Sequence, residues 1–138
     1  MRYIGLDLGS RTLGVAISDA TGLIASSYTI IRHNEEYERL VEEVKKIIDE
    51  KKIDAIVLGL PKNMNNTLGV KAELSYKFKN MLENATHLNV FLEDERLTTK
   101  QATNILLMND TSRKKRKKVI DSMAATIILQ SYLDKENS

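Results

Sequence analysis

A chain of 138 residues with an apolar fraction of 42% predicts one domain, residues 1–138, with a hydrophobic core of its own, and excludes wholesale disorder. The chain has no cysteine and only two histidines, which excludes disulfides and thiolate metal sites and leaves oxygen ligands for any metal, as Mg²⁺ and Mn²⁺ prefer. The net charge of +2 says little about partners. Because the chain shows neither a signal-peptide pattern nor an apolar run of membrane-spanning length, we expect a cytoplasmic protein without a membrane partner.

The first thirty residues predict an antiparallel meander. Residues 3–8 and 13–19 have the composition of strands, and Gly9 to Thr12 supply the turn between them. A second turn leads to residues 23–32, a third strand candidate. Short connections between successive strands favour antiparallel pairing.

The sequence changes to a helical period after residue 34. Apolar residues recur on one stripe of residues 35–52, with Asn34 as the expected N-cap, whereas residues 55–60 form the apolar run typical of a buried parallel strand. The remaining predicted elements are a loop over 61–69, helices over 70–84, 98–108 and 115–134, and a strand over 88–93. This order predicts an α/β fold: a five-stranded mixed sheet, with three antiparallel strands and then two parallel ones, flanked by helices.

Asp7 is the first candidate functional residue. In strand alternation it shares a face with Tyr3 and Gly5, and in such a fold helices cover both faces of the sheet. A carboxylate in that position must be paired, hydrogen-bonded or bound to metal. An aspartate that enters a turn can equally accept backbone N–H bonds from residues 9–11, and the residues alone leave both interpretations open.

Asp121 is the second candidate, on the margin of an apolar stripe of the last helix. An isolated acid against an apolar face needs a partner, and the alternative to a functional role is a salt bridge to one of the neighbouring lysines or arginines. The stripe also bears the small residues Ala124 and Ala125, which permit a close approach to the sheet and favour the functional role. The stripe consists of Ile120, Met123, Ala124, Ile127 and Ile128.

A third group of acids, Glu93, Asp94 and Glu95, ends the fifth strand. Open α/β sheets place their sites at this edge, although a solvated strand end is also common, and strand periodicity does not choose among the three. Three carboxylates from separate elements suit a site for two divalent metal ions, which can activate water for phosphodiester hydrolysis.

A run of six basic residues precedes Asp121. Such a run is usually a solvated face, but cations at the start of a helix oppose its macrodipole, and a phosphate backbone would relieve their mutual repulsion. Aromatic residues make up only 5% of the chain, so we expect little base stacking and weak sequence reading. The run comprises Arg113, Lys114, Lys115, Arg116, Lys117 and Lys118, and we expect Arg11 and Lys62 to extend it.

Four segments carry a resemblance to a known family. The segments GLDLGSRTLGVAISD (5–19), IVLGLPKNM (56–64), DERLTT (94–99) and IDSMAATIILQSYLD (120–134) occur in this order, and together they resemble the YqgF/RuvX family. The resemblance implies a ribonuclease-H-like fold and a bacterial nuclease that matures the 5′ end of pre-16S rRNA, with Mg²⁺ or Mn²⁺ as cofactor. By matching motifs it implies that Asp7, Glu95 and Asp121 are the catalytic residues and metal ligands, so that Glu95 is chosen from the strand-end acids.

The matched motifs also bear on nucleic-acid binding. Gly59, Pro61 and Asn63 match the family's loop after the fourth strand, and we expect Asn63 and Arg96 to join the nucleic-acid-binding residues. In one departure, Asn65 and Asn66 stand where the family commonly has Asp-Gly, so a role for an acid in that loop does not carry over.

Three alternatives stay open at this point. The family is also described as Holliday junction resolvases, which would cut four-way DNA junctions and need two sites across a dimer axis. A non-catalytic nucleic-acid-binding module is the second, although the presence of all three acids disfavours it. The third is an actin-type ATPase, suggested by residues 7–10, but such proteins close two domains of this kind around a nucleotide. We expect RNA rather than DNA as the partner, and a monomer or weak homodimer.

Overall fold

The computed structural model describes residues 1–9, 11–60, 70–94 and 113–137, without the side chains of residues 70–72, 94 and 113–122. The elements are β1 (Tyr3–Leu8), β2 (Thr12–Ser18), β3 (Ala25–Arg32), α1 (Tyr37–Lys51), β4 (Ala55–Leu60), α2 (Val70–Thr86), β5 (Val90–Asp94) and α4 (Arg113–Glu136). The five strands form one mixed sheet in the order β3-β2-β1-β4-β5. The β1–β2 and β2–β3 pairs are antiparallel, and the β1–β4 and β4–β5 pairs are parallel.

The structure confirms the α/β fold predicted from the sequence, with a meander of three antiparallel strands followed by two parallel strands. Strand ends differ by a few residues: β3 begins at residue 25 rather than 23, and β5 covers residues 90–94 rather than 88–93. The helix predicted over residues 98–108 lies outside the described part of the chain. Among the helices that are described, none has the length and hydropathy to cross a membrane.

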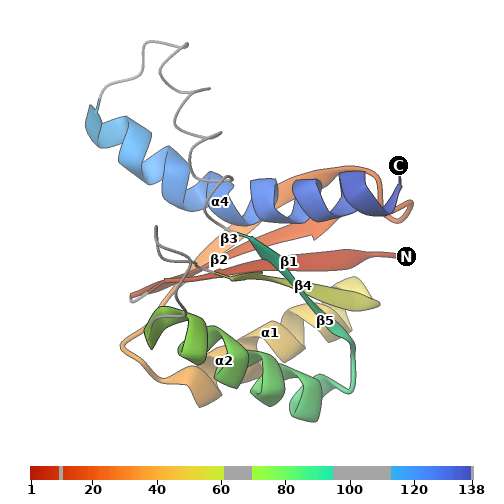
Figure 1. Cartoon of the computed structure of the whole chain (residues 1–138), viewed down its shortest axis with the longest axis horizontal. Helices are drawn as coiled ribbons and strands as arrows, with labels where there is room; N and C mark the ends of the chain where they lie inside the picture. The colour runs from red at the N-terminus through yellow and green to blue at the C-terminus, as the bar shows by residue number, and fades with distance from the viewer. Residues whose placement is uncertain (10, 61–69, 95–112, 138) are drawn as a thin grey trace.

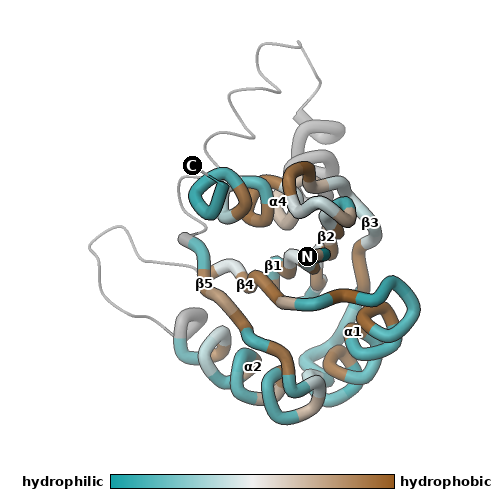
Figure 2. Tube along the Cα trace, turned by 90° about the vertical axis from the view of Figure 1, so that its right-hand side faces the viewer, coloured by the Kyte–Doolittle hydropathy of each residue, from teal (hydrophilic) through white to brown (hydrophobic). Residues whose placement is uncertain are grey.

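α1 and α2 cover one face of the sheet (Figure 1), and Figure 2 shows their hydrophobic sides turned toward the strands. The core between these layers includes Ile4 and Leu6 of β1, Leu40 and Val44 of α1, and Phe78 of α2, all fully buried. α4 (Arg113–Glu136) covers the other face of the central strands, so the apolar run of β4 is buried along its whole length.

The start of α1 differs from the prediction. The helix begins at Tyr37, and Glu36 occupies the N-cap position without a side-chain capping hydrogen bond, so the prediction of Asn34 as N-cap is wrong. Asn34 Oδ1 instead accepts a hydrogen bond from Arg11 Nη1 at 2.5 Å, and the Asn34 N–H donates to Glu36 Oε1 at 2.6 Å. The segment between β3 and α1 therefore binds the β1–β2 turn.

α4 packs on the opposite face of the sheet and buries a stripe that is shifted from the predicted one. A Cβ on Gly5 of β1 would lie 2.7 Å from Leu129 Cβ and 3.0 Å from the Ala125 carbonyl oxygen, so the helix approaches the strand at its small residues. The small residue Ala125 was expected to permit such an approach, whereas Leu129 and Leu133 were not part of the predicted stripe. Within residues 123–136 of α4, whose side chains the structure describes, Ile127 is only half-buried, and the buried residues are Ala124, Ala125, Ile128, Leu129 and Leu133.

Candidate functional site

Asp7 lies near the carboxyl end of β1, on the face that α4 covers. Tyr3 and Gly5 contact α4 from the same face of the strand, and the even-numbered residues of β1 lie in the opposite core, which confirms the predicted alternation. The Asp7 side chain is half-buried. The Gly9 N–H, one of the donors that a turn-capping role for Asp7 requires, donates instead to the Thr12 carbonyl oxygen at 2.8 Å.

Glycines flank Asp7 on both neighbouring strands. Its register partner in β2 is Gly14, and the β1–β4 register, which pairs Leu6 with Leu58, leads to Gly59 beside Asp7. A glycine inside a strand often marks a place where a ligand or another backbone comes close. Because neither neighbour has a side chain, backbone alone flanks the Asp7 carboxylate across the sheet.

α4 crosses β1 in the opposite chain direction, and two contacts fix the register between them. The rings of Tyr3 and Tyr132 meet edge-on with their centroids 5.8 Å apart, and Gly5 lies against Ala125. Moving along β1 toward Asp7 therefore moves along α4 toward its amino end, as Figure 1 shows.

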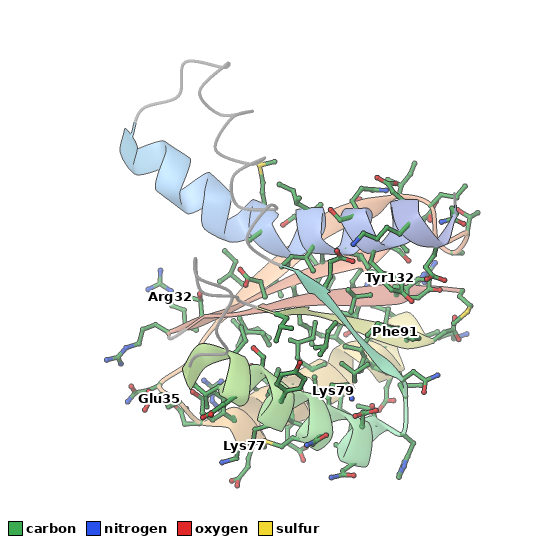
Figure 3. All side chains as sticks on the ribbon, in the orientation of Figure 1. Arg32, Glu35, Lys77, Lys79, Phe91 and Tyr132 are labelled. Atoms are coloured by element: carbon green, nitrogen blue, oxygen red, sulfur yellow. The ribbon has the colours of Figure 1, made fainter. Side chains whose placement is uncertain are left out.

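β5 presents two side chains to α4. The Phe91 ring stacks on Tyr132, with centroids 5.2 Å apart and 21° between the ring planes (Figure 3). Burial, helped by the negative charge of Glu136, raises the pKa of Tyr132 to about 12, so its phenol is neutral at physiological pH.

Glu93 is 6% exposed and accepts a charge-assisted hydrogen bond from Lys135 Nζ. Glu93 therefore has a structural partner on α4, which its place at a strand end did not predict.

Of the three predicted acids, the structure describes Asp7 completely, Asp121 by its backbone alone and Glu95 not at all. The backbone of α4 carries Asp121 four residues before Ala125, whereas Glu95 lies outside the described residues. Arg11 is exposed and donates to Asn34. No three acidic or histidine side chains gather around a common point within the described residues, so the convergence of the three predicted acids stays a prediction.

The predicted nucleic-acid-binding residues other than Arg11 have no described side chains. α4 begins at residue 113 rather than 115, so the basic run forms the first turns of the helix instead of leading into it. The residues of this run are Arg113, Lys114, Lys115, Arg116, Lys117 and Lys118, and Lys62, Asn63 and Arg96 lie outside the described part of the chain.

Two residues near this edge of the sheet escaped the sequence analysis. His33, directly after β3, is 7% exposed, and its Nε2 lies 3.0 Å from the Gly9 carbonyl oxygen. Arg32 is exposed at the end of β3 and pairs in register with Thr12 (Figure 3). The sequence offers little signal for either, because their place beside the β1–β2 turn depends on how β2 and β3 pair.

Comparison with solved structures identifies the fold class. The chain is similar in fold to Thermus thermophilus RuvC in complex with Holliday junction substrate, with a TM-score of 0.63 and 14% identity over 100% of this chain and 97% of the other. Its fold is therefore ribonuclease-H-like, as that of RuvC is, which confirms the predicted fold class.

Sequence comparison then gives the family. The family model RuvX, described as Holliday junction resolvase, matches residues 1–135, and the chain belongs to this family. A relative from Clostridium kluyveri, provisionally named a pre-16S rRNA nuclease, is 50% identical over 135 residues, which cover 98% of each chain. The predicted family and the predicted enzyme class, a nuclease among the hydrolases, are confirmed.

A partial likeness to a sugar kinase bears on the ATPase alternative. The ROK hexokinase from Thermus thermophilus is 26% identical with a TM-score of 0.51, and the match covers 74% of this chain but only 38% of the hexokinase. Most of the kinase thus has no counterpart here, in agreement with the objection that one domain cannot close around a nucleotide.

Proposed function

We propose that this chain is a metal-dependent nuclease that hydrolyses phosphodiester bonds in structured RNA, at the 5′ end of pre-16S rRNA, in the cytoplasm. The family and the names of the relatives support the nuclease class and the RNA substrate. The observation that carries the proposed site is the register between β1 and α4, which leads from the helix position of Asp121 to Asp7.

Tyr3 lies against Tyr132, and Gly5, two strand residues later, lies against both Leu129 and Ala125. Rises of about 1.5 Å per helix residue and about 3.4 Å per strand residue give a shift of about four to five helix residues for two strand residues, which lies between these two contacts. Two further residues along β1 reach Asp7, and one further turn along α4 leads from Leu129 and Ala125 to Ala125 and Asp121, which share one side of the helix. We therefore place these two acids opposite each other.

Strand alternation in β5 supports Glu95 as the third acid. Phe91 and Glu93 face α4, whereas Val90 and Leu92 belong to the opposite core. We expect the same alternation to continue beyond the end of β5, which would turn Glu95 toward α4 and Asp94 away from it. Because Glu93 is already held by a lysine of α4, Glu95 is the strand-end acid that we assign to the site.

A divalent ion such as Mg²⁺ or Mn²⁺ fits this set of residues. The donors are all carboxylates, and the register partner of Asp7 in β2 is Gly14, which has no side chain to compete with an ion for that position. Asp7, Glu95 and Asp121 would hold the ions, which when bound supply an activated water and stabilise the leaving oxygen. The chain itself brings three carboxylates from three separate elements to one edge of the sheet, and no protein nucleophile is required.

Basic residues at the same edge would bind the phosphate backbone. Arg11 is exposed in the turn after Asp7, and the basic run begins α4 at the end nearest Asp7. Contacts of this kind neutralise phosphates and orient the substrate without reading bases. We assign Lys62, Asn63 and Arg96 to the same role from their place in the matched motifs.

Substitution of the three acids tests the site. Asp7→Asn, Glu95→Gln and Asp121→Asn each keep the size of the side chain and remove its negative charge. Each should lower Mg²⁺- or Mn²⁺-dependent cleavage by about a hundredfold or more, with an unfolding midpoint near that of the unsubstituted protein. The control is Asp49→Asn, exposed on α1 on the other side of the sheet, which should cleave normally. Full activity in any site variant removes that residue from the site.

The substrate is tested by a side-by-side assay on a pre-16S 5′-leader RNA and a four-way DNA junction. The family description and the RuvC complex keep junction cleavage as the second candidate function. A junction resolvase needs two sites related by a dimer axis, whereas we propose a monomer or weak homodimer. Cleavage of the junction alone, by a stable dimer in sedimentation, would replace the RNA assignment.

A further inference from the structure

His33 is a buried titratable residue beside the proposed site that the chemistry above does not use. It follows β3 directly and is 7% exposed, and its ring lies beside Tyr37 of α1 with centroids 5.9 Å apart. Tyr37 in turn lies beside Phe78 of α2, with centroids 6.4 Å apart. His33 is thus anchored to the core that α1 and α2 form with the sheet.

Three hydrogen bonds hold His33 between its own loop and the β1–β2 turn. Its backbone N–H donates to the Arg11 carbonyl oxygen at 2.9 Å, Nε2 lies 3.0 Å from the Gly9 carbonyl oxygen, and the Glu35 N–H donates to Nδ1 at 3.0 Å. A backbone N–H only donates and a carbonyl only accepts, so Nδ1 carries the lone pair and Nε2 the proton. The geometry therefore defines one neutral tautomer, in which Nε2–H donates to Gly9.

The turn held by His33 connects Asp7 to a residue assigned to the phosphate backbone. Gly9 follows Asp7 by two residues, and Arg11 carries the exposed guanidinium. Asn34 adds a second anchor, because its Oδ1 accepts from Arg11 Nη1 at 2.5 Å. Residues 33 and 34 therefore bind both the backbone of this turn and its basic side chain.

We propose that His33 is a positioning residue of the nuclease. By holding the Gly9 carbonyl oxygen, it keeps the β1–β2 turn in the conformation that sets Asp7 and Arg11 for the phosphate backbone of the substrate. The bond to Gly9 carries this role, and the bond from Glu35 selects the tautomer that makes it. The effect on cleavage rests on the proposed function, whereas the effect on the turn does not.

Two amide substitutions separate the two bonds of the ring. In His33→Gln the side-chain nitrogen reaches the position of Nε2 and donates to Gly9, but nothing replaces Nδ1. In His33→Asn the side-chain oxygen takes the position of Nδ1 and accepts from Glu35, but nothing reaches Gly9. Both variants lose the ring packing on Tyr37 and one hydrogen bond, so their unfolding midpoints should fall by similar amounts.

We expect His33→Gln to cleave within about threefold of the unsubstituted protein, and His33→Asn to lose roughly tenfold or more in kcat at temperatures where both are folded. Hydrogen exchange is the second measurement. The Gly9 amide donates to Thr12, and the amide of residue 33 donates to Arg11. Both amides should exchange faster in His33→Asn but not in His33→Gln.

Equal cleavage by the two variants, or equal exchange of these amides, would overturn the proposal and leave His33 a purely structural residue. If the unsubstituted protein shows no metal-dependent cleavage, it is the proposed function that fails. The exchange comparison then still decides whether His33 holds the turn.

Discussion

At the scale of single residues, Tyr132 packs α4 against the sheet, and its burial there raises the pKa of its phenol. Its ring lies between those of Tyr3 and Phe91, and burial is the main reason that its pKa is raised to about 12. In the unfolded chain the pKa of a tyrosine is about 10. The folded protein therefore binds the phenolic proton more tightly than the unfolded chain does. This stabilisation is fully present below about pH 10 and is lost as the pH rises from about 10 to about 12.

Tyr132→Phe should accordingly make the stability less sensitive to alkaline pH, because the phenol that must ionise is gone. The measurement is the urea unfolding midpoint of both proteins across this pH range. The control is Tyr28→Phe on β3, where the side chain is 41% exposed and its removal should leave the alkaline loss unchanged. Parallel loss of stability in the unsubstituted protein and in Tyr132→Phe would exclude this phenol as the cause.

How far single residues could be predicted from the sequence depends on the range of their contacts. The face of Asp7 was predictable because strand alternation is local. The bonds of His33 to Gly9 and of Lys135 to Glu93 were not, because they join residues 24 and 42 positions apart. The choice of Glu95 came from the family resemblance, and it stays a prediction because Glu95 lies outside the described residues.

Between elements, the contact of β1 with α4 depends on Gly5. A Cβ at this position would lie 2.7 Å from Leu129 Cβ, closer than two such carbon atoms approach without displacement. Gly5→Ala should therefore push α4 away from the sheet and lower the free energy of unfolding by about 1–3 kcal/mol. Because α4 carries Asp121, cleavage should also fall at temperatures where the variant is folded.

Urea unfolding and a cleavage assay on the same sample measure both effects of Gly5→Ala. Ser26→Ala, exposed on β3, serves as the control and should change the free energy of unfolding little. An unchanged midpoint together with unchanged cleavage would show that α4 accommodates the added methyl group without moving relative to Asp7.

Elements were predicted better than the contacts between them. The strands, the first hairpin and the three helices within the described residues follow from glycine turns and from a change of period, which are local signals. The buried face of α4 was predicted imperfectly: the small residues were anticipated, but Leu129 and Leu133 were not, because the side of the helix that lies on β1 depends on Gly5, which is distant in the sequence. The N-cap of α1 was predicted wrongly because Asn34 binds Arg11 across the loop instead.

For the molecule as a whole, a net charge of +2 conceals an uneven distribution of charge. On the α1 side of the sheet, charges of both signs alternate and pair, as Arg39 does with Glu36 at 2.9 Å. α4, in contrast, begins with six basic residues, and its first turn contains no acidic residue. Cations at a helix amino end oppose the macrodipole, so this run does not stabilise the helix, and we infer that it serves binding.

Replacing four lysines of this run by glutamine should weaken binding of the leader RNA, measured with the cleavage-deficient Asp7→Asn protein. It should also flatten the dependence of log K on log salt, by up to about 0.7 per lost phosphate contact in single strands and about 0.9 in duplex. The four are Lys114, Lys115, Lys117 and Lys118.

The matched control changes the charge equally on the opposite side of the sheet, where exposed lysines of α1, α2 and the residue after α1 should contact no substrate. Its four glutamine substitutions are at Lys45, Lys46, Lys52 and Lys77. Removing cations from the start of α4 relieves their opposition to the helix dipole, so the first variant should melt at the same or a higher temperature. Weaker binding then cannot be ascribed to unfolding. An unchanged salt slope, or an equal loss in the control, would make the run an ordinary solvated face of the helix.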